Sequence, residues 1–339
     1  MTAATRRQLD LIDAFQRVRV AVAGDLIADE FIYGQIDRVS REAPVLILSY
    51  DSAEVLPGGA GNAARNAGSL GASVDLVGAV GRDPAGRGLY TALQAAADVS
   101  GVVQASGLVT PVKTRILAGG VHSAKQQVVR IDRAGRGLTP TTQRRVEAAL
   151  ARAMTRAEAL IVSDYGSGLV TPAVVERAVA QAGGQRPPVV LVDSRYDLGG
   201  YAGMTACTPN ESEVETLLGI RIDDNRRILE DAGRHLLDRL QCRAVLITRG
   251  SRGMALFEPR RPTDHIPIVG SDQVTDVTGA GDTVIATFAV ALAAGATFGE
   301  AARLANHAGG IVVMKRGTAV ATRGELIAAV GGPSRRTVV

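Results

Sequence analysis

Short apolar runs rich in β-branched residues alternate along the chain with longer stretches in which apolar residues recur every three or four positions. The apolar runs predict strands at residues 18–23, 74–80, 159–163, 189–193 and 244–248. The stretches with a helical period lie at 62–70, 86–97, 141–153, 172–182, 210–218, 226–240, 280–293, 298–314 and 323–329. Strands that alternate with helices predict a doubly wound α/β fold with a mostly parallel sheet. The strand runs are largely apolar, as expected when helices flank both faces of the sheet.

Residues 30–50 and 112–132 interrupt this alternation. Both segments carry β-branched residues and interleaved polar residues, and neither has a helical period. We expect extra strands that project from the main sheet, with ordinary edge hairpins as the alternative. No linker, low-complexity tract or repeat divides the chain. Residues 1–330 are therefore predicted to form one domain, followed by a disordered tail at 331–339.

Composition and charge narrow the possible functions. The chain has 339 residues, of which 46% are hydrophobic and 21% charged, as in ordinary globular proteins. The net charge is +4, but the arginines are scattered, only 3% of the residues are aromatic and tryptophan is absent. Nucleic-acid binding needs a clustered basic face or stacking rings, so we expect no nucleic-acid partner. An anionic small substrate is compatible with the basic charge.

Membrane segments and cysteine motifs are not visible in the sequence. The first residues lack a long apolar segment, and no run approaches about 18 apolar residues, so we expect a cytoplasmic protein without a membrane partner. Cys207 and Cys242 stand in or beside apolar strand-like segments, without a C-x-x-C motif. They are predicted to be buried, reduced thiols.

The clearest chemical signal is the segment Asp276-Val-Thr-Gly-Ala-Gly-Asp282, which precedes an apolar helical run. The small residues Gly279, Ala280 and Gly281 let consecutive amide N–H groups point at one place, and the helix start adds the positive end of its dipole. Such a place binds phosphate. A carboxylate at Asp282, just inside this anion pocket, indicates a catalytic group. The alternative is a common helix N-cap aspartate after a glycine turn.

A second glycine cluster, Pro57-Gly-Gly-Ala-Gly-Asn62, follows the first irregular segment. Its spacing formally fits G-x-G-x-x-A, so a dinucleotide-dependent dehydrogenase is one alternative. That fingerprint belongs at the end of the first strand, but here the first strand ends in Gly24-Asp25. Close approach of the backbone to a sugar, with Asn62 as donor and acceptor, explains the cluster better. The P-loop motif G-x-x-x-x-G-K-[ST] does not occur in the sequence.

Together, the two glycine motifs resemble the two signatures of ribokinase-type (PfkB) carbohydrate kinases. Further landmarks of that family follow in order, namely Gly24-Asp25, Val80-Gly-Arg-Asp83, Thr208-Pro-Asn210-Glu-Ser-Glu213, Leu246-Ile-Thr248-Arg-Gly250-Ser-Arg-Gly253 and Ala305-Asn306. The resemblance implies a ribokinase-like fold in which the two irregular segments form a small β lid. It also implies an ATP-dependent sugar kinase. In relatives such lids often meet across a dimer, so a homodimer is expected.

Part of the sequence is similar to kinases that act on heptose 7-phosphate. The matching positions are Gly24-Asp25, Asp29, Gly34, Arg38, Ser40, Glu42-Ala-Pro-Val45, Lys113-Thr-Arg115, Gln126-Gln127, Arg130, Asp132 and Ser163-Asp164-Tyr165. Two positions depart from that pattern: Arg41 replaces a proline, and Asp193-Ser-Arg195-Tyr stands where Asp-Pro-Lys-Gly is typical. The resemblance implies phosphorylation of the anomeric 1-hydroxyl of D-glycero-D-manno-heptose 7-phosphate. The product, heptose 1,7-bisphosphate, would serve ADP-heptose biosynthesis, for lipopolysaccharide or another glycan.

The resemblance also implies a role for each motif residue. Asp282 would act as the general base, and the amides of Gly279, Ala280 and Gly281 would stabilise the transferring phosphoryl group. ATP and Mg²⁺ would be held by Asn210, Glu211, Ser212, Glu213, Thr248, Gly250, Gly253 and Asn306, with the metal near Asn210 and Glu213. A monovalent cation would lie near Asp276 and Thr278. The sugar would contact Asp25, Asp29, Gly58, Gly59, Asn62 and Asp164. At least Arg38 or Lys113 would hold its phosphate, from a basic set that includes Arg115 and Arg130.

Three alternatives remain open. The chain could be a PfkB-type kinase for another sugar or sugar phosphate. It could be a catalytically inactive sugar-binding regulatory protein, although the presence of Asp282, Asn210 and Glu213 argues against this. The dehydrogenase is the third. Some relatives carry a nucleotidyltransferase domain with an H-x-G-H motif, and none of the four histidines stands in such a motif. We therefore expect a kinase-only polypeptide.

Overall fold

A large, mostly parallel sheet forms the centre of the molecule in a computed structural model that describes residues 2–119, 125–182, 188–269 and 276–332. Its strands are β1 (Arg19–Gly24), β4 (Ser73–Gly81), β5 (Asp98–Ala105), β8 (Ala159–Asp164), β9 (Val189–Ser194), β10 (Ala206–Cys207), β11 (Ala244–Thr248), β12 (Met254–Phe257) and β13 (Asp264–Ile266). Within the described residues these nine strands lie in the order β13-β12-β11-β10-β9-β8-β1-β4-β5. Neighbours from β11 to β5 are parallel, and β12 and β13 extend the sheet in antiparallel fashion.

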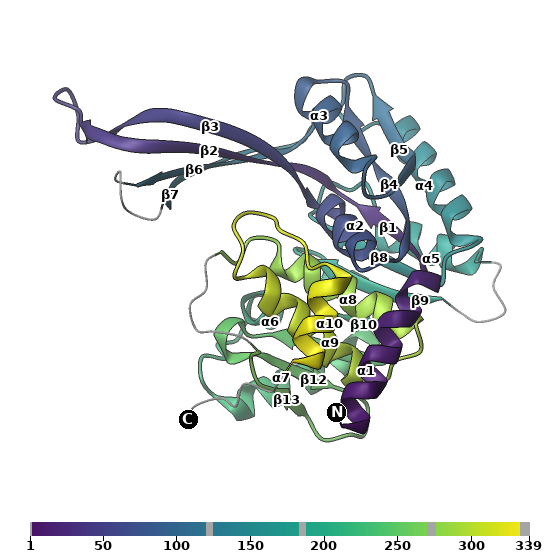
Figure 1. The fold of residues 1–339 in the computed structure, drawn as a ribbon. Helices are drawn as coiled ribbons and strands as arrows, with labels where there is room; N and C mark the ends of the chain where they lie inside the picture. Colours follow the sequence, from purple (N-terminus) through teal and green to yellow (C-terminus); the bar gives the residue numbers. More distant parts are fainter. Residues whose placement is uncertain (1, 120–124, 183–187, 270–275, 333–339) are drawn as a thin grey trace.

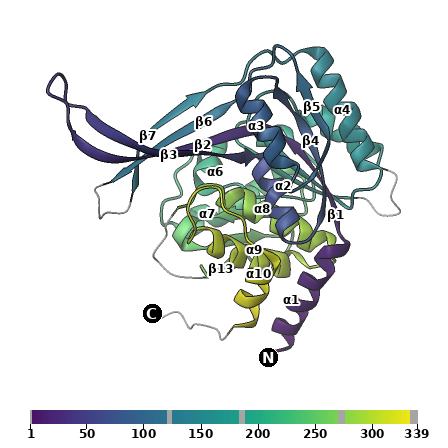
Figure 2. The ribbon, with the colours of Figure 1, turned by 45° about the horizontal axis from the view of Figure 1, so that its top comes forward.

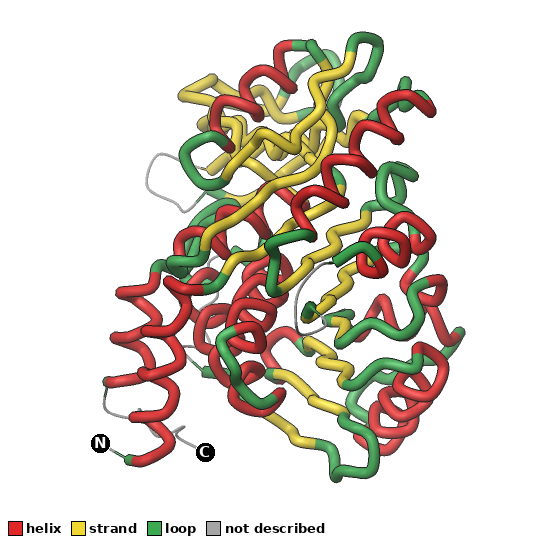
Figure 3. Tube along the Cα trace, turned by 90° about the vertical axis from the view of Figure 1, so that its right-hand side faces the viewer, coloured by secondary structure: helices red, strands yellow, loops and turns green. Residues whose placement is uncertain are grey.

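Helices cover both faces of this sheet (Figures 1 and 3). They are α1 (Ala3–Ala14), α2 (Ala60–Ser69), α3 (Pro84–Leu93), α4 (Pro140–Met154), α5 (Pro172–Ala180), α6 (Glu211–Leu218), α7 (Arg226–Leu240), α8 (Ala280–Ala293), α9 (Phe298–Val312) and α10 (Arg323–Gly331), with short 3₁₀ helices at Phe15–Arg17, Leu198–Gly200 and Gly250–Arg252. One face packs against α1–α3 and α8–α10, and the other against α4–α7. In β1, Val20 and Val22 enter the first core, whereas Ala21 and Ala23 enter the second. The predicted doubly wound α/β fold is confirmed.

A second, four-stranded sheet projects from the body of the molecule (Figures 1 and 2). It consists of β2 (Leu26–Val39), β3 (Leu46–Gly59), β6 (Val112–Gly119) and β7 (Gln126–Arg133), in the order β3-β2-β6-β7. We call it the lid sheet. Its strands include most of the two segments, 30–50 and 112–132, in which extra strands were expected. The hairpin β2–β3 is longer than expected, because β2 starts directly after β1 and β3 runs into the start of α2.

The two faces of the lid sheet differ in chemistry. Asp29 of β2 is paired with Lys113 of β6, and Arg115 lies two residues after Lys113 on the same strand. Arg130 of β7 lies opposite Arg115. These charged side chains therefore share one face, the face toward the main body. The other face carries three exposed apolar side chains, Val55, Val129 and Ile131, with exposed fractions of 44%, 48% and 49%. The lid sheet thus has one charged face and one face on which exposed apolar side chains flank the Glu30–Arg133 ion pair.

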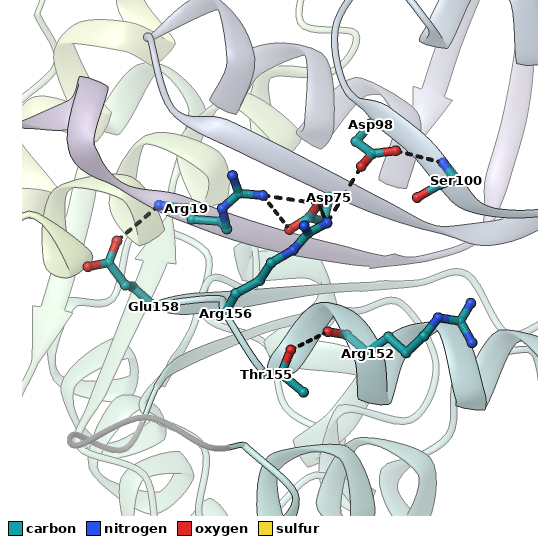
Figure 4. Close-up of polar contacts among 8 residues, drawn as sticks. All are labelled: Arg19, Asp75, Asp98, Ser100, Arg152, Thr155, Arg156 and Glu158. Atoms are coloured by element: carbon teal, nitrogen blue, oxygen red, sulfur yellow. Dashed lines mark hydrogen bonds and ion pairs between the residues drawn. The ribbon is translucent and has the colours of Figure 1, made fainter.

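At the amino ends of the central strands, Asp75 holds several elements together (Figure 4). Its buried carboxylate pairs with Arg19 of β1 at 3.3 Å and with Arg156 at 2.7 Å. Arg156 also reaches Asp98 of β5 at 3.5 Å. Two arginines satisfy this buried charge, so the cluster ties β1, β4 and β5 to the segment after α4. This edge lies opposite the carboxyl ends of the strands, where open α/β sheets bind their ligands.

Three further expectations concern the burial of the cysteines, membrane-spanning helices and the C-terminal tail. Cys207 and Cys242 are both free and buried, as predicted. In the described part of the chain, no helix combines the length and the apolar character that crossing a membrane requires. The tail predicted to be disordered lies almost entirely outside the described residues.

Candidate active site

The first turn of α8 forms an anion-binding pocket that contains a buried carboxylate. Gly279, the residue before the helix, has a left-handed backbone with φ of 77° and ψ of 5°. A Cβ atom at this position would lie 2.4 Å from Nδ2 of Asn62, so the turn requires glycine. The Ala280 amide, predicted to stabilise the phosphoryl group, instead donates to the carbonyl oxygen of Val277 at 3.2 Å, so the amides of the cavity-lining Gly279 and Gly281 are the ones placed to meet an anion. Asp282 lies in this first turn with 4% of its surface exposed.

The two oxygens of the Asp282 carboxylate differ in their surroundings. Oδ2 accepts a hydrogen bond of 2.8 Å from Nδ2 of Asn62. Oδ1 is buried and has no hydrogen-bond partner among the described residues. Burial raises the pKa of Asp282 to about 7; the Asn62 hydrogen bond opposes this, Asp29 adds to it and Lys113 opposes it. A carboxyl group with a pKa near neutral and one free oxygen is suited to accept a proton.

Asp282 opens into a polar cavity of about 200 Å³, which we call the inner cavity. The lid sheet, the carboxyl ends of the central strands, and the starts of α6 and α8 supply its walls. They contribute Asp29, Gly59, Lys113, Arg115, Arg130, Tyr165, Asp193, Arg195, Thr208, Asn210, Glu213, Thr248, Thr278, Gly279, Gly281 and Asp282. The structure therefore brings residues from motifs up to about 250 positions apart to one place, as expected at the carboxyl edge of an open α/β sheet.

A second and larger cavity of about 450 Å³, the outer cavity, adjoins the first. Four residues, Lys113, Arg130, Tyr165 and Arg195, line both cavities. The outer cavity also contains Arg133 and Arg136 from the end of the lid sheet and the segment that follows it, together with Asp25, Asp132, Ser167 and Tyr196. Its lining is mostly apolar but carries five basic side chains and only two carboxylates, whereas the inner cavity has four basic and four acidic side chains.

Four of the residues predicted to contact a sugar lie in or beside these cavities. Asp25 lines the outer cavity and accepts backbone hydrogen bonds from Tyr165 (2.7 Å) and Ser167 (3.4 Å), and burial raises its pKa. Asp29 lines the inner cavity and forms an ion pair of 2.5 Å with Arg115. Gly59 lines the inner cavity, and a Cβ at Gly58 would lie 2.2 Å from Oδ2 of Asp29. Both glycines let the backbone pass close to the site.

Three other residues proposed for the substrate are placed differently. Asp164 lines neither cavity, because its carboxylate accepts hydrogen bonds from Ser194 (2.9 Å) and Tyr201 (3.1 Å). Asn62 is fully buried behind Asp282 and lines neither cavity. Arg38 pairs with Asp37 near the far end of β2, with 66% of its side chain exposed. Nine residues of extended strand separate it from Asp29, about 30 Å, so it does not reach the cavities within this chain.

The predicted nucleotide and metal residues divide into two groups. Asn210, Glu213 and Thr248 line the inner cavity. Asn210 caps α6: its Oδ1 accepts from the Glu213 amide at 2.9 Å, and Oε2 of Glu213 accepts from the Asn210 amide at 3.0 Å. Burial raises the pKa of Glu213, and the Asn210 hydrogen bonds oppose the shift. The reciprocal capping bonds fix both side chains at the cavity wall.

The other predicted nucleotide residues lie outside both cavities. Glu211 pairs with Arg249 at 2.6 Å and with Arg252, and Ser212 is exposed at the surface of α6. Gly253 has φ of 78°, and a Cβ there would lie 2.1 Å from the carbonyl oxygen of Ile266, so this glycine is required by the turn before β12. Gly250 also has a left-handed backbone. Asn306 donates a hydrogen bond of 2.7 Å to the carbonyl oxygen of Pro267.

Asp276 and Thr278 were expected near a monovalent cation. Both oxygens of Asp276 accept backbone hydrogen bonds, from Thr278 at 2.9 Å and from Gly317 at 3.0 Å. Asp276 therefore ties the loop before α8 to the segment after α9, and only Thr278 of the pair lines the inner cavity. Among the described residues, no group of three or more His, Cys, Asp or Glu side chains is arranged to hold a metal ion.

Several cavity residues were not among the predicted site residues. Asp193 lies near the end of β9 and Arg195 directly follows that strand, just as Asp25 follows β1. This position at the carboxyl end of a strand could have identified them as site residues from the sequence. Burial raises the pKa of Asp193 well above its usual range, with Glu213 and Asp282 adding to the shift and Arg195 opposing it. The carboxylates that line the inner cavity therefore repel one another, and Arg195 partly offsets this repulsion.

A doubly wound α/β sheet, a buried carboxylate at a helix start and a basic β lid above it together define a carbohydrate kinase of the ribokinase-like type. The chain belongs to the pfkB carbohydrate kinase family, whose sequence profile matches residues 25–323. The family resemblance seen in the sequence is thereby confirmed.

Relatives and solved structures agree with this class. The chain is 40% identical over 316 residues to the bifunctional protein HldE of Caulobacter vibrioides, with 93% of this chain and 64% of that protein covered. For the bifunctional protein HldE of Geobacter sulfurreducens the identity is 38%, with 93% and 63% covered. The chain thus spans just under two thirds of the length of these relatives. Similar folds are phosphofructokinase-2 from Escherichia coli in complex with substrates and products (TM-score 0.74, 18% identity, 93% and 99% covered) and Arabidopsis thaliana ribokinase complexed with ribose and ATP (TM-score 0.70, 20% identity, 92% and 98% covered).

Proposed function

We propose that the protein transfers the γ-phosphoryl group of ATP to the anomeric 1-hydroxyl of D-glycero-D-manno-heptose 7-phosphate. The product would be heptose 1,7-bisphosphate, a precursor for ADP-heptose. One observation carries the choice of a phosphorylated sugar. The basic outer cavity adjoins the inner cavity that contains Asp282, so a second anion can be held at a distance from the transferring phosphoryl group.

Each part of the inner cavity has a task in this reaction. Asp282 removes the proton of the sugar hydroxyl as that oxygen attacks the γ-phosphorus. The amides at the start of α8, next to Gly279 and Gly281, stabilise the charge on the transferring group. Asn210 and Glu213 would hold Mg²⁺ through waters, and the ion would neutralise charge on the ATP phosphates. Of the two residues predicted for a monovalent cation, Asp276 and Thr278, Thr278 lines the cavity and would serve that cation.

The sugar-borne phosphate would lie among basic side chains of the outer cavity. Lys113, Arg136 and Arg195 line it and have no ion-pair partner within the described residues. Arg130 is paired with Asp132 at 2.7 Å, and Arg133 lies 3.6 Å from Glu30. The three unpaired side chains can form charge-assisted hydrogen bonds with phosphate without first losing a carboxylate. Burial lowers the pKa of Lys113, with Asp29 opposing the shift, so a bound phosphate would favour its charged form.

A coupled assay of ADP formation with a panel of heptoses, hexoses, pentoses and their phosphates tests this function. We expect the highest kcat/KM with heptose 7-phosphate and little turnover of unphosphorylated sugars. Arg136→Ala should raise the KM for heptose 7-phosphate about tenfold, the scale of one charged hydrogen bond, with the KM for ATP unchanged. Arg136 suits this test because it lines the outer cavity alone. Lys113→Ala should raise both KM values, since Lys113 lines both cavities.

Arg145→Ala is the matched control, since Arg145 is an exposed arginine of α4 outside both cavities. Its kinetic constants should equal those of the wild type. Equal kcat/KM values for free sugars and their phosphates would contradict the assignment of a phosphorylated substrate. A best substrate that is a different sugar phosphate would support the second candidate, a PfkB-type kinase with another acceptor. The exposed Tyr196, beside Arg195 at the outer cavity, favours considering that candidate, because this segment departs from the heptose-kinase pattern.

We further propose that the protein forms a homodimer through the apolar face of the lid sheet. Val55 on β3, and Val129 and Ile131 on β7, lie on this face at the two edges of the lid sheet and are about half exposed. Apolar side chains on an exposed sheet face are costly to leave in water, at about 25 cal/mol per Å². A second copy of the same face is a complementary occupant, since a two-fold axis can place the exposed apolar side chains of one chain against those of the other.

Val129→Asp should convert the dimer to a monomer, because association would bury the new carboxylate in an apolar contact. Light scattering should give a mass of about twice 35.2 kDa for the wild type and one chain mass for the variant. Val129→Thr keeps the β-branched shape without a charge and should remain dimeric. A monomeric wild type at micromolar concentration would refute this interface.

A further inference from the structure

A buried chain of three polar side chains lies behind Asp282 and links α2 to α8. Asn62 donates from Nδ2 to Oδ2 of Asp282 at 2.8 Å. Oδ1 of Asn62 accepts from Nδ2 of Asn66 at 3.2 Å. Oδ1 of Asn66 accepts from the hydroxyl of Thr283 at 2.9 Å. Asn62, Asn66 and Thr283 each have an exposed fraction of 0%, so water does not compete for these bonds.

The order of donors and acceptors fixes the orientation of each amide. The backbone amide of Ala321 donates to Oδ1 of Asn66 at 3.4 Å, as does the Thr283 hydroxyl, which also donates to the carbonyl oxygen of Gly279 at 3.3 Å. Nδ2 of Asn66 is therefore the group that faces Asn62. Nδ2 of Asn66 also donates to the backbone carbonyl oxygen of Asn62 at 3.0 Å. Asn62 must then present Oδ1 to Asn66 and Nδ2 to Asp282. A flipped Asn62 amide would bring its oxygen against the Asp282 carboxylate and its NH₂ group against that of Asn66, which is unfavourable at both ends.

We infer that Asn62 is the positioning residue of the catalytic base, held in one orientation by Asn66 and Thr283, so that Oδ1 of Asp282 is the oxygen that takes the substrate proton. This inference rests on the proposed kinase function. The sequence motif suggested that Asn62 contacts the sugar, but its side chain is buried behind Asp282 and lines neither cavity. Asn66 and Thr283 carried no predicted role at all.

The proton transfer follows from this geometry. The substrate O–H bond breaks, and its proton passes to Oδ1 of Asp282. The same substrate oxygen forms its new bond to the γ-phosphorus, and the bond from that phosphorus to the β,γ-bridging oxygen breaks, with its electron pair leaving on ADP. Oδ2 keeps its hydrogen bond to Asn62 throughout, which prevents the carboxylate from rotating.

The amide of Asn62 is also the hydrogen-bond donor that favours the charged form of Asp282. Burial raises the pKa of Asp282, and the Asn62 hydrogen bond opposes this rise. The other titratable groups around Asp282 are Asp29 and Lys113 from the lid sheet, Tyr165 after β8 and Asp193 of β9. None of them touches Asn66. Loss of the Asn62 orientation should therefore raise the pKa of Asp282 further, and the acid side of the pH–rate profile should move to higher pH.

The test is the pH dependence of kcat from about pH 5.5 to 9.5, with the best acceptor from the panel and saturating Mg²⁺ and ATP. The kcat of the wild type should decrease as the pH is lowered through about 7, because Asp282 then becomes protonated. Asn66→Ala, which lies outside both cavities, should move this limb upward by roughly one pH unit, the scale of one hydrogen bond to a charged group. At the highest pH its kcat should recover to within about threefold of the wild type. Asn62→Ala should shift the limb at least as far.

The matched control is Thr287→Val, one turn further along α8. The buried hydroxyl of Thr287 donates only to the carbonyl oxygen of Thr283, at 2.8 Å, so its removal should leave the limb in place. Should Asn66→Ala fail to fold by circular dichroism, Thr283→Val removes one hydroxyl at nearly constant shape and should give a smaller shift in the same direction. An unshifted limb in the folded variants, or a loss of rate that is equal at all pH values, overturns the inference. A wild type without turnover of any sugar or sugar phosphate would instead overturn the proposed function.

Discussion

Replacing Asp282 by asparagine should lower kcat by about 100-fold or more, the usual scale for loss of a positioned general base. The variant keeps the size of the side chain but cannot accept a proton at neutral pH. Asp282 is buried in the first turn of α8, next to the amides that would face the transferring phosphoryl group, so the chemical step should bear the effect. The measurement is steady-state ADP formation with saturating substrates.

Binding of ATP by the Asp282→Asn variant should remain close to that of the wild type, because the cavity keeps Asn210, Glu213 and Thr248. Isothermal titration with a non-hydrolysable ATP analogue and a thermal melt provide the controls. A folded variant that binds the analogue and turns over within threefold of the wild type would contradict the role of Asp282 as the base.

A second large effect is expected from Gly279→Ala, which should lower kcat by at least tenfold. The alanine would have to adopt φ of 77°, and its Cβ would meet Nδ2 of Asn62 at 2.4 Å. A left-handed backbone alone costs about 1–2 kcal/mol for a residue with a side chain. Relief of the contact requires either a displaced α8 start or a displaced Asn62. Both movements disturb the anion pocket or the hydrogen bond to Asp282, and loss of one such donor commonly costs 100-fold or more.

Gly295→Ala separates backbone strain from this steric effect. Gly295, after the end of α8, has φ of 90°, and nothing lies within 4 Å of an added Cβ. Both variants should therefore lose stability in a thermal melt, but only Gly279→Ala should lose kcat at temperatures where both are folded. Equal kcat values in the two variants would show that the contact with Asn62 has no catalytic consequence.

The central fold could be predicted because its strands are buried on both faces. β1 is apolar at every position that enters either core, and the same holds for β8 and β11. Strand β5 was missed because Ser100 and Gly101 interrupt its apolar pattern. The strands β12 and β13 are only four and three residues long, too short for a periodic signal.

The candidate site could be predicted only as far as local motifs reach. The amide pocket at Gly279 follows from a glycine turn before a helix, and Asn210 and Glu213 follow from the first turn of another helix. The hydrogen-bonded chain through Asn66 could not be foreseen, because it depends on the packing of α2 against α8, more than 200 residues apart in sequence. The expectation for Arg38 depended on strand length, since a long β2 carries that residue away from the cavities.

The contrast between the two faces of the lid sheet has a thermodynamic consequence. A four-stranded sheet with charges on one side and exposed apolar side chains on the other encloses no core of its own, so its order depends on what covers each face. If the substrate phosphate covers the charged face and a second chain covers the other face, each binding step offsets part of the conformational entropy lost when the same strands become ordered. The two equilibria are then linked, and linkage is reciprocal: whatever factor dimerisation adds to sugar phosphate affinity, sugar phosphate adds to dimer affinity. An enzyme built in this way would respond to its own concentration as well as to that of its substrate.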